Sequence, residues 1–425
     1  MKIAIVGSGV AGNVAAYRLH REHDITVFEA ADRPGGHTHT HVIEIGGREY
    51  HVDTGFIVFN DWTYPSFIEL LAELGVGSQP SHMSFSVRCE RSGLEYNGTS
   101  LNSLFAQRRN LLRPSFHRML RDILRFNREA PRLLAPTAAG TSLGNYLQDE
   151  RYSREFVDHY LVPMGAAIWS AQPRRMLEMP AHFLIHFFHN HGMLSVNRRP
   201  QWRVIRGGSQ AYLQRLIAPY RYRLRTASPV AGVRRHPTQV EIELADGAHE
   251  RFDHVFLACH SDQALRLLRD PTTAEREVLG AIPYQDNEVV LHTDTRLLPR
   301  RKLAWAAWNY HLLDTAQQGA AVTYNMNILQ GLDAPETFCV TLNRSADIDP
   351  RKVIKRLHYA HPMFTPAAVA AQARHGEING ACRTWYCGAY WRYGFHEDGV
   401  VSALEALRQF DRETQHAQLP LRRVG

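Results

Sequence analysis

Three glycines near the start of the chain have the spacing that brings a polypeptide backbone close to a phosphate. Gly7-Ser-Gly9-Val-Ala-Gly12 follows the apolar run 2–6 and precedes the segment 13–21, which has helical periodicity. In such a strand, turn and helix, the first glycine makes the tight turn and the second lets backbone N–H groups approach a pyrophosphate. The third lets the helix pack on the strand. Val10 and Ala11 open the helix, whose N-terminus faces the phosphates. The spacing predicts a dinucleotide site.

A carboxylate and a second glycine turn extend this site. The apolar run 25–28 ends in Glu29 and Ala30, where a carboxylate can bind ribose hydroxyls. Gly35-Gly36-His37-Thr38 follows directly, and its glycines give the backbone access to a cofactor beyond the adenosine half. An NAD site has no need of this second turn. The two turns together therefore predict FAD.

These motifs resemble the flavin amine oxidase and phytoene desaturase superfamily, whose members carry an acid, a few residues, then Gly-Gly-Arg and a threonine. In this chain His37 stands where that arginine usually lies. The resemblance implies an α/β fold, with a Rossmann-type FAD-binding domain similar to glutathione reductase and p-hydroxybenzoate hydroxylase and an inserted α+β substrate domain. The expected boundaries are 1–75, 200–270 and 375–425 for the discontinuous FAD-binding domain, and 76–199 and 271–374 for the substrate and membrane-facing domain.

The resemblance also implies cofactor contacts from later segments. Residues 53–57 look like the strand and turn that pass beside the isoalloxazine ring, and the strand 230–233 looks like the one that meets the adenine. The strand 252–259 and the segment 384–402 are further returns to the cofactor domain. The contacts implied are Gly55, Phe56, Ile57, Val230, Cys259, Gly388 and Ala389.

A closing helix is expected to begin near Gly399 and Val400 and to run through Leu407. Its N-terminus would aim unpaired N–H groups and a partial positive charge at the flavin pyrimidine, which stabilises the anion formed on reduction. The segments Tyr-Cys-Gly-Ala-Tyr-Trp and Gly-Phe-His-Glu-Asp-Gly before it resemble a bacterial branch associated with cyclopropane, methyl-branched and furan fatty acid formation. That resemblance implies the acyl chain of a membrane lipid as the substrate.

Lysine is missing from the region where many flavin amine oxidases use it. These enzymes hold a water near the flavin N5 with a lysine on a strand equivalent to 286–292, and this chain has no lysine between Lys2 and Lys302. This absence favours desaturation, in which two hydrogens leave a carbon chain as a hydride to FAD and a proton to a base. Candidate bases are His396, Glu397 and His191. The alternatives are a soluble amine oxidase and a flavin-containing lipid-binding partner without turnover.

Two histidine clusters invite a metal interpretation. The first is 37–41, with three histidines in alternation, and the second contains His182 and His186, which would share one face of a helix. No carboxylate accompanies the second cluster at a di-iron spacing, so a polar wall or ordinary packing is the expected role and no metal is predicted. Cys387, inside the C-terminal motif, is expected to pack rather than to bind flavin covalently.

A basic amphipathic helix is predicted from Pro114. Phe116, Met119, Leu120, Ile123 and Leu124 should form its apolar face, and Arg118, Arg121, Arg125 and Arg128 its basic face. The helix is either part of the core with a solvated charged face or a surface helix on anionic phospholipid. The net charge of +7 is compatible with the second interpretation. Nucleic acid is not an expected partner, because no base-reading motif is present.

Cellular location and partners are predicted only in outline. No apolar run approaches the roughly 18–20 residues that span a bilayer, and a buried-strand pattern begins at Lys2, so neither a signal peptide nor an integral membrane protein is expected. Five cysteines without a CxxC pair argue against a disulfide framework. We expect a cytoplasmic protein that is peripheral on the inner face of the membrane. A redox partner and a homo-oligomer are left open.

Overall fold

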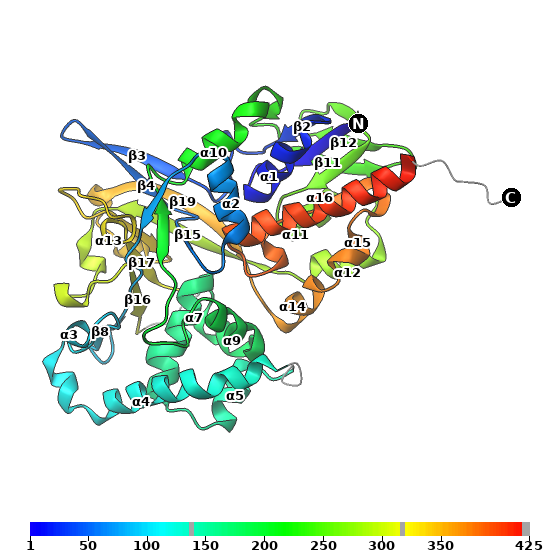
Figure 1. The fold of residues 1–425 in the computed structure, drawn as a ribbon. Coiled ribbons are helices and arrows are strands. Elements are labelled where there is room, and N and C mark those ends of the chain that lie inside the picture. The colour runs from blue at the N-terminus through cyan, green and yellow to red at the C-terminus, as the bar shows by residue number, and fades with distance from the viewer. Residues whose placement is uncertain (136–139, 315–318, 419–425) are drawn as a thin grey trace.

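A five-stranded parallel sheet lies at one end of the molecule (Figure 1). The computed structural model describes residues 1–135, 140–314 and 319–418. The strands of this sheet come from the beginning, the middle and the end of the chain. Their order is β10 (Leu224–Arg225), β2 (Asp24–Phe28), β1 (Lys2–Val6), β14 (His254–Leu257) and β20 (Thr384–Tyr386).

Both faces of the parallel sheet are covered, as the apolar character of β1 requires. Side chains alternate along a strand, so Ile3 and Ile5 pack on one side and Ala4 and Val6 on the other. The first side is covered by the helices α1 (Val10–Leu19), α2 (Pro65–Glu73), α10 (Gln210–Ile217) and α16 (His396–Gln418). The second side is covered by the antiparallel sheet β11 (Val230–Arg235), β12 (Val240–Leu244) and β13 (His249–Phe252), and by α11 (Ser261–Leu267), α12 (Thr273–Gly280), α14 (Pro366–Gln372) and α15 (His375–Ile378).

A buried ion pair joins three of these segments. Arg235 at the end of β11 donates to Glu275 of α12 at 2.9 Å, and the hydroxyl of Tyr386 in β20 donates to the same carboxylate at 2.6 Å. The side chain of Glu275 is 0% exposed. Although burial raises the pKa of Glu275, the hydrogen bonds from Arg235 and Tyr386 outweigh it and hold the pKa below its usual value.

A seven-stranded mixed sheet forms the second layer. Its strands are β19 (Val353–Pro362), β15 (Tyr284–His292), β18 (Cys339–Leu342), β17 (Val322–Asn325), β16 (Trp308–Leu312), β7 (Phe85–Cys89) and β8 (Glu95–Asn97). Two small sheets connect it to the parallel sheet. They are β3 (Thr40–Ile45) with β4 (Arg48–Asp53), and β5 (Val58–Asn60) with β9 (Trp202–Ile205) and β6 (Ser78–Pro80). The domain boundaries expected from the sequence stay a prediction.

Short helices form a separate cluster at the end opposite the parallel sheet (Figure 1). They share a core of buried aromatic and aliphatic side chains with the seven-stranded sheet. The main ones are α3 (Leu101–Leu104), η1 (Arg108–Leu112), α4 (Pro114–Glu129), α5 (Leu143–Asp149), α7 (Val162–Trp169), α8 (Pro173–Glu178) and α9 (Ala181–Asn190). None of the helices in the described part of the chain is long and apolar enough to cross a membrane.

The predicted basic helix is confirmed as α4, but one of its residues was assigned to the wrong face. Phe116, Met119 and Phe126 are buried against the helical core, as the periodicity indicates. Leu124 was expected on the same face, yet 60% of it is exposed. Leu124 lies about 80° around the helix from Phe116, which places it beside Arg121 and Arg128.

Candidate functional site

The first glycine turn forms the floor of a cavity. Gly7 has a φ of 101°, which favours glycine, and Gly9 precedes the first residue of α1 without any side chain to cap the helix. The uncapped N–H groups of Val10 and Ala11 therefore belong to residues that line the cavity. A β-carbon on Gly12 would lie 2.0 Å from the carbonyl oxygen of Gly7, so only glycine lets the helix and the turn approach this closely.

Glu29 holds the glycine turn in place. One of its carboxylate oxygens accepts from the N–H and the hydroxyl of Ser8, at 2.9 and 2.6 Å. The other accepts from the N–H of Ala31 at 2.9 Å. Glu29 and Ala30 both line the cavity. The carboxylate thus lies between the end of β2 and the turn, the position at which a ribose hydroxyl is bound in dinucleotide sites.

The second glycine turn packs directly on the first. Gly35 donates to the carbonyl of Ser8 at 2.9 Å, and a β-carbon on Gly36 would lie 3.3 Å from the α-carbon of Gly9. Gly36 and His37 line the cavity, whereas Thr38 points elsewhere and its hydroxyl pairs with Tyr212 at 2.7 Å. Gly55 approaches the same turn, since a β-carbon there would lie 1.8 Å from the carbonyl of His37. The second glycine turn and the segment around Gly55, which are distant from the first turn in sequence, therefore form part of the cavity floor.

The C-terminal segment closes the cavity, with one difference from the expectation. Gly388 and Ala389 line the cavity, and Gly388 donates to the Ser402 hydroxyl at 2.9 Å. Helix α16 begins at His396, one turn earlier than expected, and the N–H of Gly399 bonds to the carbonyl of Phe395 at 3.1 Å. The N–H groups without a helical partner therefore belong to the first turn of α16 and not to Gly399 and Val400.

The complete cavity has a volume of about 800 Å³. The predicted cofactor residues that line it are Gly7, Gly9, Val10, Ala11, Glu29, Ala30, Gly36, His37, Gly55, Phe56, Ile57, Val230, Cys259, Gly388 and Ala389. The predicted residues that support it from behind are Gly12, Gly35, Thr38, Gly399 and Val400. Burial raises the pKa of the thiols of Cys259 and Cys387 to about 12, so both are protonated and unreactive at neutral pH.

A wall of histidines, which the sequence did not predict as a group, faces the same space. His260 and His361 line the cavity with His37, and their ring centroids lie 5.8 and 5.4 Å from that of His37. Burial lowers the pKa of all three, that of His361 to about 4, so the wall is neutral at physiological pH. Tyr359 of β19 stacks 4.8 Å from His37. This neutral wall takes the place of the arginine expected from the family resemblance.

Among the three candidate bases, only His396 reaches the cavity. Its ring lies 4.4 Å from that of Phe56 and stacks on Phe67 at 4.6 Å. Within the described residues its Nε2 has no hydrogen-bond partner, although it is buried. Burial lowers the pKa of His396 to about 3, which keeps the ring neutral.

The other two candidates have structural partners. Glu397 accepts from the N–H groups of Ser66 and Phe67, at 3.1 and 2.8 Å, and so caps helix α2, whose own preceding residue Tyr64 provides no side-chain cap. His191 lies outside the cavity lining. Its Nδ1 contacts the carbonyl of Phe187 at 2.9 Å. We therefore retain neither as the proposed proton acceptor.

We expect Glu397→Ala to lower the free energy of unfolding by about 2 kcal/mol, because two N–H groups at the start of α2 would lose their acceptor. Denaturant unfolding of the FAD-bound protein measures this loss. Glu69→Ala is the matched control, since Glu69 is exposed on the same helix. A Glu397→Ala protein as stable as the Glu69→Ala protein would contradict the capping role.

The protein atoms that line the cavity show whether FAD fits there. A β-carbon on Gly9 would have no neighbour within 4 Å, which leaves room for a pyrophosphate above α1. In the described part of the chain, Nε2 of His37, Nε2 of His396 and the hydroxyl of Tyr390 are buried without a partner, and all three residues line the cavity. Buried polar groups normally have partners, so these atoms suit a polar ring system such as isoalloxazine.

No lysine lies among the residues that line the cavity. The ammonium of Lys302, the first lysine after Lys2, lies 5.8 Å from the ring centroid of Trp305. The described residues also contain no group of three or more histidine, cysteine, aspartate or glutamate side chains suited to a metal. Burial and the neighbouring His186 lower the pKa of His182 on α9.

Known proteins share this sequence pattern and this fold. The family described as flavin containing amine oxidoreductase matches residues 10–325. The flavin-dependent L-tryptophan oxidase RebO from Lentzea aerocolonigenes is 46% identical over 55 residues, and the match spans 13% of this chain and 12% of that protein.

Two solved structures are similar over almost their whole length. Cyclohexylamine oxidase from Brevibacterium oxydans IH-35A has a TM-score of 0.70 and 16% identity over 97% of this chain and 99% of that chain. The CLA-producing fatty acid isomerase from P. acnes has a TM-score of 0.69 and 16% identity, over 96% and 98% of the two chains. Identities this low establish the fold alone. Since the family match covers most of the sequence, the chain belongs to the flavin-containing amine oxidoreductase family and is an FAD-dependent oxidoreductase.

Proposed function

We propose that this flavoenzyme desaturates a methyl-branched or otherwise modified fatty acyl chain of a membrane lipid, within the branch associated with branched and furan fatty acids. The proposal rests on the chemistry of the part of the cavity that lies beyond the glycine turns. Its walls there are largely aromatic and aliphatic, its histidines are neutral, and it has no lysine. The apolar lining residues are Ile168, Trp169, Trp308, Tyr324, Phe364, Tyr393 and Phe395.

The aromatic part of this wall is rigidly supported by the helical cluster. Trp169 at the end of α7 donates from its indole N–H to the carbonyl of Tyr393 at 3.1 Å. Phe364 and Phe395 stack on Phe183 and Phe187 of α9, with centroid distances of 5.0 and 5.3 Å. A surface of this kind stabilises hydrocarbon by removing it from water.

The fold likeness to a fatty acid isomerase adds support for an acyl substrate, since that enzyme's name states a fatty acid. When bound, FAD supplies the two-electron acceptor for a hydride. Loss of two hydrogens also releases a proton. His396 is one of the unpaired groups on the cavity wall, together with His37, and can receive the proton at Nε2. The aromatic wall holds the carbon chain and excludes water.

Anaerobic mixing of the FAD-bound protein with micelles of methyl-branched phospholipid tests the function. We expect the flavin absorbance to bleach and the recovered acyl chain to lose two hydrogens by mass. Unbranched phospholipid of equal length is the matched control. If none of the acyl chains bleaches the flavin, desaturation is wrong, and if oxidised flavin persists with every amine as well, a carrier without turnover is favoured.

We expect His396→Asn to slow flavin reduction by about a hundredfold without loss of FAD, because proton acceptors contribute on this order. Stopped-flow reduction with saturating substrate gives the rate, and FAD absorbance gives the cofactor content. His191→Asn is the control, since that residue lies outside the cavity lining. Equal rates for the wild type and His396→Asn would assign the proton to another group.

Amine oxidation is the second candidate function, favoured by one specific feature of the wall. The rings of Trp308 and Tyr324 lie at 85° to one another, with centroids 5.1 Å apart, and both line the cavity. An aromatic pair can hold an ammonium ion by cation–π attraction. Bleaching by cyclohexylamine or putrescine, with none by acyl chains, would favour this function.

A further inference from the structure

Exposed leucines lie on four helices, α3, η1, α4 and the short helix η7 (Lys302–Ala304), of which η7 contacts α3 and η1 contacts α4. They make up five of the eleven large apolar side chains that are exposed in the described part of the chain: Leu101, Leu111, Leu112, Leu124 and Leu303. The exposed fraction reaches 87% for Leu112 and 76% for Leu101. Single exposed apolar residues are ordinary, but a group of them marks an interaction site.

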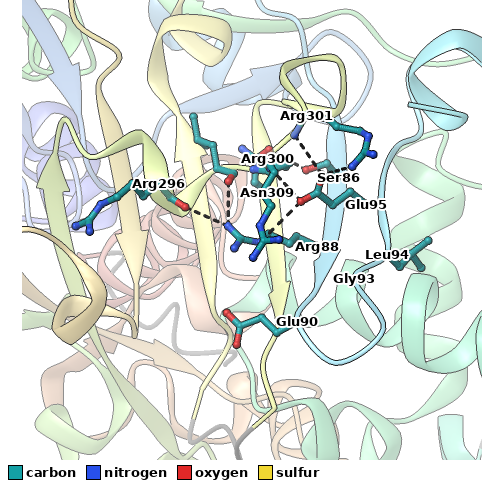
Figure 2. Close-up of polar contacts among 12 residues, drawn as sticks. Ser86, Arg88, Glu90, Gly93, Leu94, Glu95, Arg296, Arg300, Arg301 and Asn309 are labelled. Atoms are coloured by element: carbon teal, nitrogen blue, oxygen red, sulfur yellow. Dashed lines mark hydrogen bonds and ion pairs between the residues drawn. The ribbon is translucent and has the colours of Figure 1, made fainter. Parts of the chain in front are cut away.

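Two distant stretches of sequence are locked together to form this surface. Glu95 of β8 accepts from the backbone N–H groups of Arg300 and Arg301, at 2.9 and 3.2 Å (Figure 2). Asn97 donates to the carbonyl of Trp305 at 2.8 Å, and η7 contacts α3. The segment 300–303 is therefore held in a fixed position beside Leu101.

The charge of this surface is almost entirely positive. Residues 98–121 and 295–312 contain no aspartate or glutamate. Arg108, Arg109, Arg121, Arg300, Arg301 and Lys302 are exposed there. The buried carboxylate of Glu95, which is 3% exposed, accepts from two backbone N–H groups and lies 3.9 Å from the guanidinium of Arg301, so it offsets part of this charge.

The arginines of α4 divide into two groups. Arg118 pairs with Glu155, and Arg125 and Arg128 pair with Glu129, so acids of the protein neutralise them. Arg121 forms no ion pair within the described residues. Apart from Arg301, which pairs with Glu95 at 3.9 Å, the cations of the surface at η7, η1 and the middle of α4 have no acidic partner in the described part of the chain. The exposed leucines lie on the same helices.

We propose that this leucine–arginine surface, made of the five leucines and the six cations named above, docks the protein on an anionic lipid bilayer. Leucines at the boundary of headgroups and acyl chains gain from leaving water, while the cations meet lipid phosphates and the negative surface potential. Figure 1 shows α4 along the lower edge of the molecule and α3 at its lower left. The proposal does not depend on which substrate the flavin oxidises.

The surface suits a bilayer better than a nucleic acid. Phosphate contacts account for the cations in both cases, but a nucleic acid backbone gives no gain to exposed leucines. Replacing the leucines should therefore weaken binding to a bilayer but leave binding to a nucleic acid unchanged.

Co-sedimentation of the FAD-bound protein with extruded vesicles tests the proposal. Vesicles of phosphatidylcholine alone are compared with vesicles that contain 30% phosphatidylglycerol, roughly the level of an anionic membrane, at low and at high salt. We expect strong binding to the anionic vesicles at low salt, weaker binding at high salt, and little binding to the neutral ones.

Two variants separate the contributions of charge and apolar contact. Arg300→Gln/Arg301→Gln/Lys302→Gln should weaken binding by about a hundredfold, since each cation near an anionic surface contributes about fivefold. Leu111→Ser/Leu112→Ser should weaken it by at least tenfold at constant charge. Arg215→Gln/Tyr222→Ser, exposed on α10 and the segment after it at the other end of the molecule, should bind like the wild type.

Several outcomes would overturn the proposal. Equal binding to neutral and anionic vesicles, or wild-type binding by the triple charge variant, would exclude docking through this surface. Wild-type binding by the leucine variant together with loss in the charge variant would show a polyanion site of the nucleic-acid kind. Bound FAD and thermal unfolding verify that each variant is folded, and Leu124→Ser replaces the double leucine variant if that protein does not fold.

Discussion

Gly12→Ala is expected to yield a protein that retains no FAD after gel filtration and unfolds more readily than the wild type. A β-carbon at this position would lie 2.0 Å from the Gly7 carbonyl oxygen and 3.0 Å from the β-carbon of Ala258. Both contacts are with the fixed ends of β1 and β14, so the helix and the turn must separate. Overpacking of this kind costs about 1–3 kcal/mol and also opens the turn that holds the pyrophosphate.

Gly9→Ala separates the effect on cofactor binding from the effect on folding. Its φ of −66° suits any residue, and a β-carbon there would have no neighbour within 4 Å. We expect normal stability without FAD, but FAD binding weaker by about tenfold or more, since the methyl group occupies the space above α1. Titration of apoprotein with FAD and thermal unfolding give the two quantities. Gly376→Ala, on a short helix with open space at its β-carbon, is the matched control and should change neither.

Glu275→Gln is expected to lower the free energy of unfolding by about 3 kcal/mol, because the buried guanidinium of Arg235 would keep only the partly exposed Asp270 as a charged partner. The loss should also reduce FAD retention, since the pair fixes β11, whose Val230 lines the cavity. Denaturant unfolding measures the loss in the free energy of unfolding. Glu243→Gln breaks an exposed pair with Arg269 on the same strand system and should have a much smaller effect.

The pH dependence of stability gives an independent test of this ion pair. The pKa of Glu275 is lower in the folded protein than in the unfolded chain, so its ionised form stabilises the fold. That stabilisation is present above the unfolded pKa and is lost as the pH falls through the lower, folded value. The wild type should therefore lose stability on acidification more steeply than Glu275→Gln. Parallel curves for the two proteins would exclude an ionised Glu275 in the fold.

The features of the site that depend on local sequence could be predicted. Gly7, Gly9 and Glu29 lie at the ends of two adjacent strands, and their spacing alone specifies the turn and the position of the carboxylate. The second turn was predictable for the same reason, because positive φ at Gly35 and Gly36 is a property of glycine itself. The roles of these residues can be predicted without the rest of the sequence.

The features that depend on strand register and long-range contact could not be predicted. His361 meets His37 only because β19 pairs with β15 in a register that places Tyr359 opposite Asn287. Glu397 is a candidate base from the sequence, but in the structure it caps a helix 330 residues away. Helix α16 starts earlier than expected because Asp398 accepts from the N–H groups of Tyr393 and Phe395. An acid three residues after the N-cap is a signal of a helix start, and this signal was missed in the sequence.

The strands of the parallel sheet come from distant parts of the chain, and this has a consequence for synthesis in the cell. Strand β20 and helix α16, which complete the cavity, lie in the last tenth of the 425-residue chain. At about 5–20 residues per second, the ribosome finishes the glycine turns at least about 17 seconds before it makes their final partners. The nascent chain must therefore wait with an unfinished, apolar sheet edge until β20 and α16 have been made. We expect this interval to be the stage at which the protein most needs protection from aggregation.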